Sequence, residues 1–384
     1  MEGSATAAGG RAQVRSVAFL IGHLGMGGTQ RQLSLLAREL RGRGVEVHVL
    51  LLSKDGPHEP ELRAAGVGVH HLGFTRRPPR PRAAAENARA FARLVGLLRR
   101  LRPDVLHAFL REGYVLGAPA ARLAGVPVTV AGRRNQSRLE RRRRWLRPLE
   151  GALNLIVDHV AVNAAALAED AHTADGVPTR KLSVIYNGLP APAFDPVEPE
   201  QVDTAFPVVV CVARLSPEKG HRVLVEAAAD LARRGRPCTF VLVGDGPERG
   251  RLEGRVDASG ADVRFAGVRG DVRGFLARAD VVVLPSLSEG LSNAVMEAMA
   301  AGRPVVATAV GGTAELLGDR GILVPAADPQ ALADGIARLL DDPVLAASLA
   351  DAALAWARKN LGLDVMVDAH LALYGRLLEA RRAR

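Results

Sequence analysis

The chain has 384 residues, enough for two domains, and 48% of them are hydrophobic, which excludes a disordered protein. The formal net charge is +10, but arginine supplies nearly all of it and aromatic residues make up only 4%, so a nucleic-acid surface that stacks bases is not expected. The sequence contains no apolar run near the ~20 residues that a membrane span needs, and the basic surface fits anionic lipid or a phosphorylated substrate better.

The first half alternates predicted strands and helices. Leu33, Leu36, Ala37 and Leu40 recur at helical spacing in the first helix. We expect strands at 16–22, 45–52, 104–109, 126–132, 159–163 and 182–188, with helices at 29–44, 84–101 and 117–125. The opening residues are polar and lack the apolar segment of a secretory signal, so we expect a short tail there.

The second half repeats this plan. We expect strands at 206–213, 238–244, 262–267, 280–286 and 304–308, with a helix at 221–235 and another after residue 291. Fully apolar strands separated by helices are typical of parallel sheets that are covered on both faces. The sequence therefore predicts an α/β protein with two doubly wound, Rossmann-like domains that face a central cleft.

The proline-rich, acidic stretch 189–206 interrupts both patterns and is predicted to be a linker. The expected organisation is a flexible tail at 1–14, an N-terminal domain at 15–188, the linker at 189–206, a C-terminal domain at 207–362, and a final helix at 363–384 that packs back on the N-terminal domain.

Cys211 and Cys238 each lie in a strand-like run. They lack metal-ligand spacing and are too few for a disulfide framework. We expect two small buried side chains in a protein of a reducing cytoplasm.

The segment 285–307 follows a predicted strand and contains Glu289 in a loop and Glu297 inside an apolar helix. Ser292 and Asn293 are good helix caps, so the N–H groups of Gly290, Leu291 and Ser292 would form an anion site at a helix N-terminus. Glu297 either accepts hydrogen bonds from ligand hydroxyls or pairs with a basic neighbour such as Arg303.

Two more strand ends carry candidate ligand contacts. Arg214 and Lys219 follow the strand at 206–213, where they could neutralise a diphosphate or simply be solvated loop charges. Gly244 and Gly246 follow the strand at 238–244 and either let a ligand approach the backbone or form a tight turn.

The first glycine-rich loop contains Gly22, Gly25, Gly27 and Gly28. Its spacing does not fit the G-x-G-x-x-G pattern of dinucleotide-binding folds, and Asp55 lies past the end of the next strand. An NAD-dependent oxidoreductase is therefore disfavoured.

Taken in their order along the chain, these motifs resemble those of the family 4 glycosyltransferases, which are retaining enzymes of the GT-B fold. The resemblance runs from about residue 15 to 370 and rests on LGMGGTQRQL, PDVLHAF, VIYNG, ARLSPEKG, VGDGP, FAG before Val268, PSLSEGLSNAVMEAMAAGRPVVAT, GGTAEL and GILVPAADPQAL.

The resemblance implies roles for these residues. Arg214, Lys219 and the backbone of Leu291–Asn293 would hold the donor diphosphate, with Glu289 on the transferred sugar and Glu297 on the ribose. Val268 would border the base, the VGDGP glycines Gly244 and Gly246 would lie at the donor, and Gly27 and Gly28 would approach its phosphate from the other domain. Such enzymes need no metal or other cofactor.

The sequence departs from the family pattern where members often carry a histidine after the GVPV strand. Arg133 stands about there, and Arg133, Arg134 or Asn135 could contact the donor or an anionic acceptor. His107, at the end of a neighbouring strand, is either a catalyst or a structural histidine. Gln30 replaces the usual acid of the first loop.

The run Arg141–Trp145 could form a basic amphipathic helix on anionic lipid, or be a solvated helix in an arginine-rich protein. We expect a cytoplasmic enzyme, soluble or peripheral on the inner face of the cell membrane. It would move a hexose-type sugar from a nucleotide sugar, a UDP-sugar by expectation, to a hydroxyl of a cell-envelope glycan or a lipid-linked acceptor. The alternative is a nucleotide-sugar-binding protein of the same fold that has lost catalysis.

Overall fold

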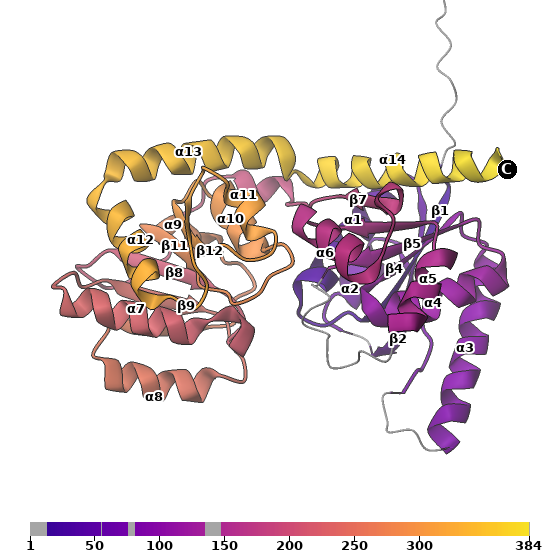
Figure 1. The fold of residues 1–384 in the computed structure, drawn as a ribbon, viewed down its shortest axis with the longest axis horizontal. Coiled ribbons are helices and arrows are strands. Elements are labelled where there is room, and N and C mark those ends of the chain that lie inside the picture. Colours follow the sequence, from indigo (N-terminus) through magenta and orange to yellow (C-terminus); the bar gives the residue numbers. More distant parts are fainter. Residues whose placement is uncertain (1–13, 55, 76–80, 135–146, 384) are drawn as a thin grey trace, which may run out of the picture. The chain divides into compact units, whose positions relative to one another are not determined.

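The computed structural model describes residues 14–54, 56–75, 81–134 and 147–383. Its contacts divide the chain into two compact units. Unit 1 contains the described residues up to Val162, Ala168–Ile185 and the chain from Asp364 onward, whereas unit 2 contains Asn163–Leu167 and Tyr186–Leu363. Each unit has its own parallel sheet (Figure 1), so the predicted fold class of two doubly wound domains is confirmed.

Unit 1 is built on a seven-stranded sheet in the order β3-β2-β1-β4-β5-β6-β7, with all neighbours parallel. The strands are β1 (Ser16–His23), β2 (Glu46–Lys54), β3 (Gly68–His71), β4 (Val105–Phe109), β5 (Val128–Arg133), β6 (His159–Val162) and β7 (Leu182–Val184). The helices are α1 (Gly28–Gly42), α2 (Glu59–Ala64), α3 (Pro81–Leu101), α4 (Leu110–Ala124), α5 (Arg147–Ile156), α6 (Ala165–Asp175), whose first residues belong to unit 2, and α14 (Leu363–Arg382).

Apolar strand residues buried on both faces form the core of this sheet. All residues of β4, β5 and β6 are buried, as are the four apolar positions that the sequence places on one face of α1. Helix α14 contributes Tyr374, whose hydroxyl lies 2.7 Å from Nδ1 of His107 on β4. The last helix is therefore part of the unit 1 core.

Helix α4 begins seven residues earlier than the expected start at Gly117. Gly113 and Gly117, which look like helix breakers, lie where the helix packs closely against β1. A Cβ at either position would lie 2.9 Å from an atom of Leu20. Close packing thus requires these glycines inside a helix.

Unit 2 is built on a six-stranded sheet in the order β10-β9-β8-β11-β12-β13, again entirely parallel. The strands are β8 (Val208–Val212), β9 (Thr239–Val243), β10 (Val263–Gly267), β11 (Val281–Leu284), β12 (Val305–Thr308) and β13 (Ile322–Val324). The helices are α7 (His221–Arg233), α8 (Arg249–Ser259), α9 (Arg273–Arg278), α10 (Asn293–Ala300), α11 (Thr313–Leu317), α12 (Pro329–Asp341) and α13 (Pro343–Asn360).

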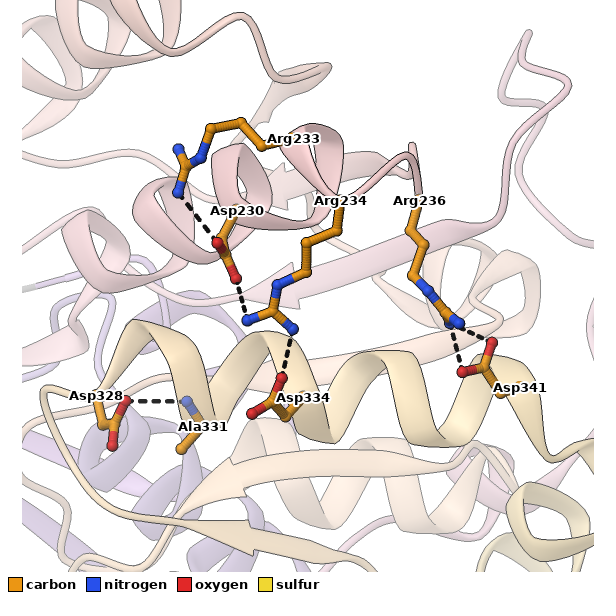
Figure 2. A network of polar contacts seen from close by, with 8 residues as sticks. All are labelled: Asp230, Arg233, Arg234, Arg236, Asp328, Ala331, Asp334 and Asp341. Carbon is orange, nitrogen blue, oxygen red and sulfur yellow. Dashed lines mark hydrogen bonds and ion pairs between the residues drawn. The ribbon is translucent and has the colours of Figure 1, made fainter.

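Helices α7 and α12 lie side by side on one face of this sheet (Figure 1) and share its core. Ion pairs join their outer surfaces (Figure 2), with Asp230 bound by Arg233 and Arg234, and Arg234 continuing to Asp334. Exposed pairs of this kind contribute about 0–1 kcal/mol each, so the apolar core dominates the packing of the two helices.

Cys211 and Cys238 are both buried, unpaired thiols in this core. Burial raises the pKa of Cys211 to about 12 and that of Cys238 to about 11. The prediction of two small buried side chains is confirmed. In the ranges that the structure describes, no helix is long and apolar enough to cross a bilayer.

Candidate functional site

The strand order of unit 2 reverses between β8 and β11, which lie next to each other. In open parallel sheets, ligands bind at the carboxyl ends of the strands on either side of such a reversal. Arg214 and Lys219 follow β8, and Glu289 follows β11. Topology alone therefore brings these three predicted residues to one edge of one sheet.

Lys219 and Glu289 are in direct contact. The Lys219 ammonium donates to Glu289 Oε1 at 2.6 Å, and the Ser286 hydroxyl donates to the same oxygen at 2.7 Å. The Glu289 side chain is 7% exposed and the Lys219 side chain 24%. The pair thus places a carboxylate and a cation together in a sheltered position, each able to exchange its partner for a ligand group.

Backbone contacts fix the loops after β8 and β11 to each other. The N–H of Leu287 donates to the carbonyl oxygen of Glu218 at 2.8 Å. Gly220 has a φ of +68°, and a Cβ there would lie 2.0 Å from the carbonyl oxygen of Pro285. This glycine is therefore needed for the close approach of the two loops.

Arg214 is exposed and lies two residues after the end of β8. Burial alone would raise the pKa of Glu218, but hydrogen bonds from Ser216 and from the backbone, with the charges of Lys219 and Arg214, lower it on balance. The loop thus holds the Glu218 carboxyl mainly by hydrogen bonds, and the charges of Lys219 and Arg214 add to their effect.

Helix α10 begins where the sequence predicts. Ser292 is its N-cap, and its hydroxyl accepts from the N–H of Val295 at 3.3 Å. The first helical residue, Asn293, accepts at Oδ1 from Nδ2 of Asn187 at 2.8 Å. An N-terminus after a strand offers N–H groups and a partial positive charge to an anion, and this one begins four residues after Glu289.

Glu297 is buried inside α10, with 9% of the residue exposed. Arg303, the basic neighbour considered from the sequence, donates instead to the carbonyl oxygen of Ala279 at 3.5 Å.

Gly244 and Gly246 pack against the backbone of the loop after β8. Their Cβ atoms would lie 2.1 Å from the carbonyl oxygen of Ala213 and 2.3 Å from that of Leu215, respectively. Both glycines are therefore needed for the fold of the site, whatever ligand approaches them. Val268, beyond β10, is 59% exposed and free to border a ligand.

Unit 1 has its own reversal, between β1 and β4. Gly27 caps α1 and Gly28 is its first residue. A Cβ on Gly27 would lie 2.3 Å from Oε1 of the buried Gln30, so a larger residue would displace that side chain. The two glycines form an open helix start after β1, as the sequence predicts.

His107 is completely buried in unit 1. Its ring contacts the Tyr374 hydroxyl and stacks on Phe109 with centroids 4.2 Å apart. Burial, with smaller effects from His370 and Arg134, holds the pKa of His107 well below its usual value. Of the two roles considered, this geometry fits the structural one.

Arg133 and Arg134 are also buried. Arg133 pairs with Asp175 and donates to Asn154 Oδ1 at 2.9 Å. The guanidinium of Arg134 lies 5.2 Å from the centroid of the Phe109 ring, and burial lowers its pKa to about 10. Asn135 and Arg141–Trp145 lie outside the described residues.

Two family models match most of the chain. The one described as Glycosyltransferase Family 4 matches residues 26–191, and the one described as Glycosyl transferases group 1 matches residues 206–342. The 2-deoxystreptamine glucosyltransferase of Streptomyces kanamyceticus is 30% identical over 92% of this chain and 100% of its own length. The chain belongs to glycosyltransferase family 4.

Two further relatives of this glycosyltransferase match along nearly their whole length. The lipopolysaccharide core biosynthesis glycosyltransferase LpsE of Rhizobium meliloti is 27% identical over 90% of this chain and 95% of its own. The crystal structure of HepE of Anabaena in complex with UDP is 25% identical, covers 94% of this chain and 99% of that one, and has a TM-score of 0.80. The GT-B architecture implied by the motifs is confirmed.

The sequence did not identify every residue that shapes the site of this glycosyltransferase. Ser286 and Asn187 were not singled out, although each contacts a predicted site residue. Asn187 lies in VIYNG, one of the motifs that carries the resemblance, so its position after a strand was the available signal.

Proposed function

We propose that the protein is a retaining glycosyltransferase that transfers a hexose-type sugar from a UDP-sugar to a hydroxyl of a cell-envelope glycan or glycolipid. The observation that carries the proposal is the Lys219–Glu289 pair, 2.6 Å apart, beside the N-terminus of α10 at the reversal of strand order in unit 2. This edge combines two cations, Arg214 and Lys219, with a sheltered carboxylate and a helix N-terminus, which suits a negative diphosphate joined to a polyhydroxylated sugar.

In this reaction, Arg214, Lys219 and the N–H groups at the start of α10 bind the donor diphosphate. They stabilise the charge that develops as the bond from the anomeric carbon to the phosphate oxygen breaks. When the donor binds, the Glu289 carboxylate gives up its contact with Lys219 and accepts hydrogen bonds from hydroxyls of the transferred sugar. The acceptor oxygen bonds to the anomeric carbon on the face that the diphosphate leaves, and its proton passes to a phosphate oxygen. Because fixed cations and a helix terminus neutralise the leaving group, the proposed reaction needs no metal.

Glu297 lies one turn into the same helix and is proposed to accept hydrogen bonds from the ribose. The preference for uridine is supported by HepE, a fold neighbour whose structure contains UDP. The two free thiols fit a cytoplasmic site of action. A membrane contact through Arg141–Trp145 stays a prediction, because that run lies outside the described residues.

A small acceptor is a second candidate, favoured by a specific comparison. Among the relatives are a 2-deoxystreptamine glucosyltransferase, 30% identical over 92% of this chain, and a 2-deoxystreptamine N-acetyl-D-glucosaminyltransferase, 31% identical over 80%. Their names state an aminocyclitol acceptor rather than a polymer. An aminocyclitol is therefore the alternative acceptor class for the same donor reaction.

Transfer of labelled sugar from a panel of UDP-, GDP- and TDP-sugars to lipid-linked and aminocyclitol acceptors tests the proposal. We expect turnover with a UDP-hexose and a product that keeps the donor's anomeric configuration. An inverted product would refute the retaining mechanism. Tight UDP binding with neither transfer nor slow donor hydrolysis would instead support a binding protein that has lost catalysis.

A further inference from the structure

The start of helix α6 (Ala165–Asp175) is capped by a residue from a distant part of the chain. Ala164 precedes the helix, so no side chain at the cap position can accept its first N–H groups. Glu315 supplies the acceptor from 150 residues away. The N–H of Ala165 lies 2.9 and 2.7 Å from its two carboxylate oxygens, and the N–H of Ala166 lies 3.3 Å from one of them.

The same carboxylate also acts on the Tyr186 side chain, whose pKa it raises. Burial raises the pKa of Tyr186, and the charge of Glu315 raises it further, so the phenol stays a donor. Glu315 therefore contacts the Asn163–Leu167 segment directly, and its charge acts on Tyr186, the first residue of the next segment of unit 2.

The turn that precedes Glu315 lies directly on the proposed donor loop. The N–H of Gly312 donates to the carbonyl oxygen of Gly290 at 2.7 Å. A Cβ on Gly311 would lie 2.0 Å from the carbonyl oxygen of Glu289, and one on Gly312 would lie 2.7 Å from the Cβ of Ala164. The turn is thus packed between Ala164 and the loop that holds Glu289.

We infer that Glu315 is a positioning residue for donor binding, which rests on the proposed function. Its carboxylate ties the Asn163–Leu167 segment to α11, and the Gly311–Gly312 turn then holds the Glu289–Gly290 backbone in place. Without the carboxylate, the start of α6 has unpaired N–H groups and the turn loses its support on one side. The donor loop then has to be ordered by the donor itself, which weakens binding.

A second helix of the same unit provides a matched control. Helix α12 is capped from within by Asp328, whose Oδ1 accepts from the N–H of Ala331 at 2.9 Å (Figure 2). Asp328→Ala and Glu315→Ala each remove one carboxylate that caps one helix. Only Glu315 is joined through its turn to the donor loop, so only its loss is expected to reach the nucleotide.

The first measurement is hydrogen exchange of the backbone amides of residues 286–295 in the unliganded full-length protein. We expect exchange about tenfold faster in Glu315→Ala than in the wild type, an intermediate rate in Glu315→Gln, which keeps one acceptor oxygen, and no change in Asp328→Ala. Wild-type exchange in Glu315→Ala would overturn the inference. This readout does not depend on which nucleotide the protein uses.

The second measurement is UDP affinity by calorimetry in the same four proteins. We expect about tenfold weaker binding in Glu315→Ala, partial recovery in Glu315→Gln, and wild-type affinity in Asp328→Ala. If the wild type binds no UDP, the proposed function fails while the exchange result still decides the role of Glu315. Equal UDP affinity in the wild type and Glu315→Ala would overturn the positioning role.

Discussion

Replacing Glu289 with glutamine keeps the shape of the side chain and removes its charge. The Lys219 ammonium lies 2.6 Å from Oε1, and the two side chains are 24% and 7% exposed, respectively. At an effective dielectric constant of about 20, two unit charges at that distance attract by roughly 6 kcal/mol. Desolvation offsets most of this, and the partly exposed Lys219 can hydrate once released, so we expect the free energy of unfolding to fall by about 2 kcal/mol.

The effect on transfer is expected to be larger than the effect on stability. If Glu289 holds hydroxyls of the transferred sugar, the neutral amide loses charged hydrogen bonds that matter in the transition state, and kcat/KM should fall roughly 100-fold. UDP lacks the transferred sugar, so we expect the Glu289→Gln variant to bind UDP at least as tightly as the wild type does. Labelled-sugar transfer and calorimetry with UDP measure the two effects separately.

Asp341→Asn is the matched control for this substitution. Asp341 pairs with Arg236 on the outer surface of α12 (Figure 2), and its side chain is 53% exposed. A surface pair contributes about 0–1 kcal/mol, so transfer and stability should both stay near wild type. Folded Glu289→Gln with a kcat/KM within threefold of wild type would refute the reasoning.

Three further results are expected. Arg214→Ala and Lys219→Ala should each weaken UDP binding about tenfold, measured by calorimetry, because each removes a charge from the proposed diphosphate site; wild-type affinity in both would contradict this. Gly246→Ala should lose more than about 2 kcal/mol of stability in urea unfolding, because its Cβ would meet the Leu215 carbonyl. Gly250→Ala lies in α8, where no described heavy atom is within 4 Å of the new Cβ, so its free energy of unfolding should rise by about 0.5–1 kcal/mol. Equal effects of the two substitutions on stability would count against the packing argument. Burial lowers the pKa of His221 to about 4, below its unfolded value, so the unfolded state binds the proton first as pH falls from about 6.5 to 4; of the stability lost between pH 7 and 5, about 2 kcal/mol should come from His221, and a His221→Gln variant with the same pH slope would refute this role.

The strands could be predicted because they are nearly pure apolar runs bounded by polar turns. The start of α10 was also predictable, since Ser292 and Asn293 follow a strand and precede an apolar helix. Helix α4 was predicted too short, with its start at Gly117, because the sequence does not reveal that Gly113 and Gly117 pack closely against β1.

The candidate site could be predicted one residue at a time but not as a set of contacts. Lys219 and Glu289 were each placed at a strand end, yet their contact depends on β8 and β11 being neighbours, which is a property of the sheet order. The contacts of Asn187 with Asn293 and of Glu315 with Ala165 join residues 106 and 150 positions apart. No local pattern in the sequence specifies such pairs.

The position of a bound nucleotide tests the central claim most directly. A crystal structure of the protein with UDP should place the diphosphate within hydrogen-bonding distance of the backbone N–H groups at Leu291–Asn293 and of the Lys219 ammonium, with the Lys219–Glu289 contact exchanged for a phosphate contact. A diphosphate bound at any other edge of the unit 2 sheet, with Lys219 and Glu289 still paired, would contradict the account.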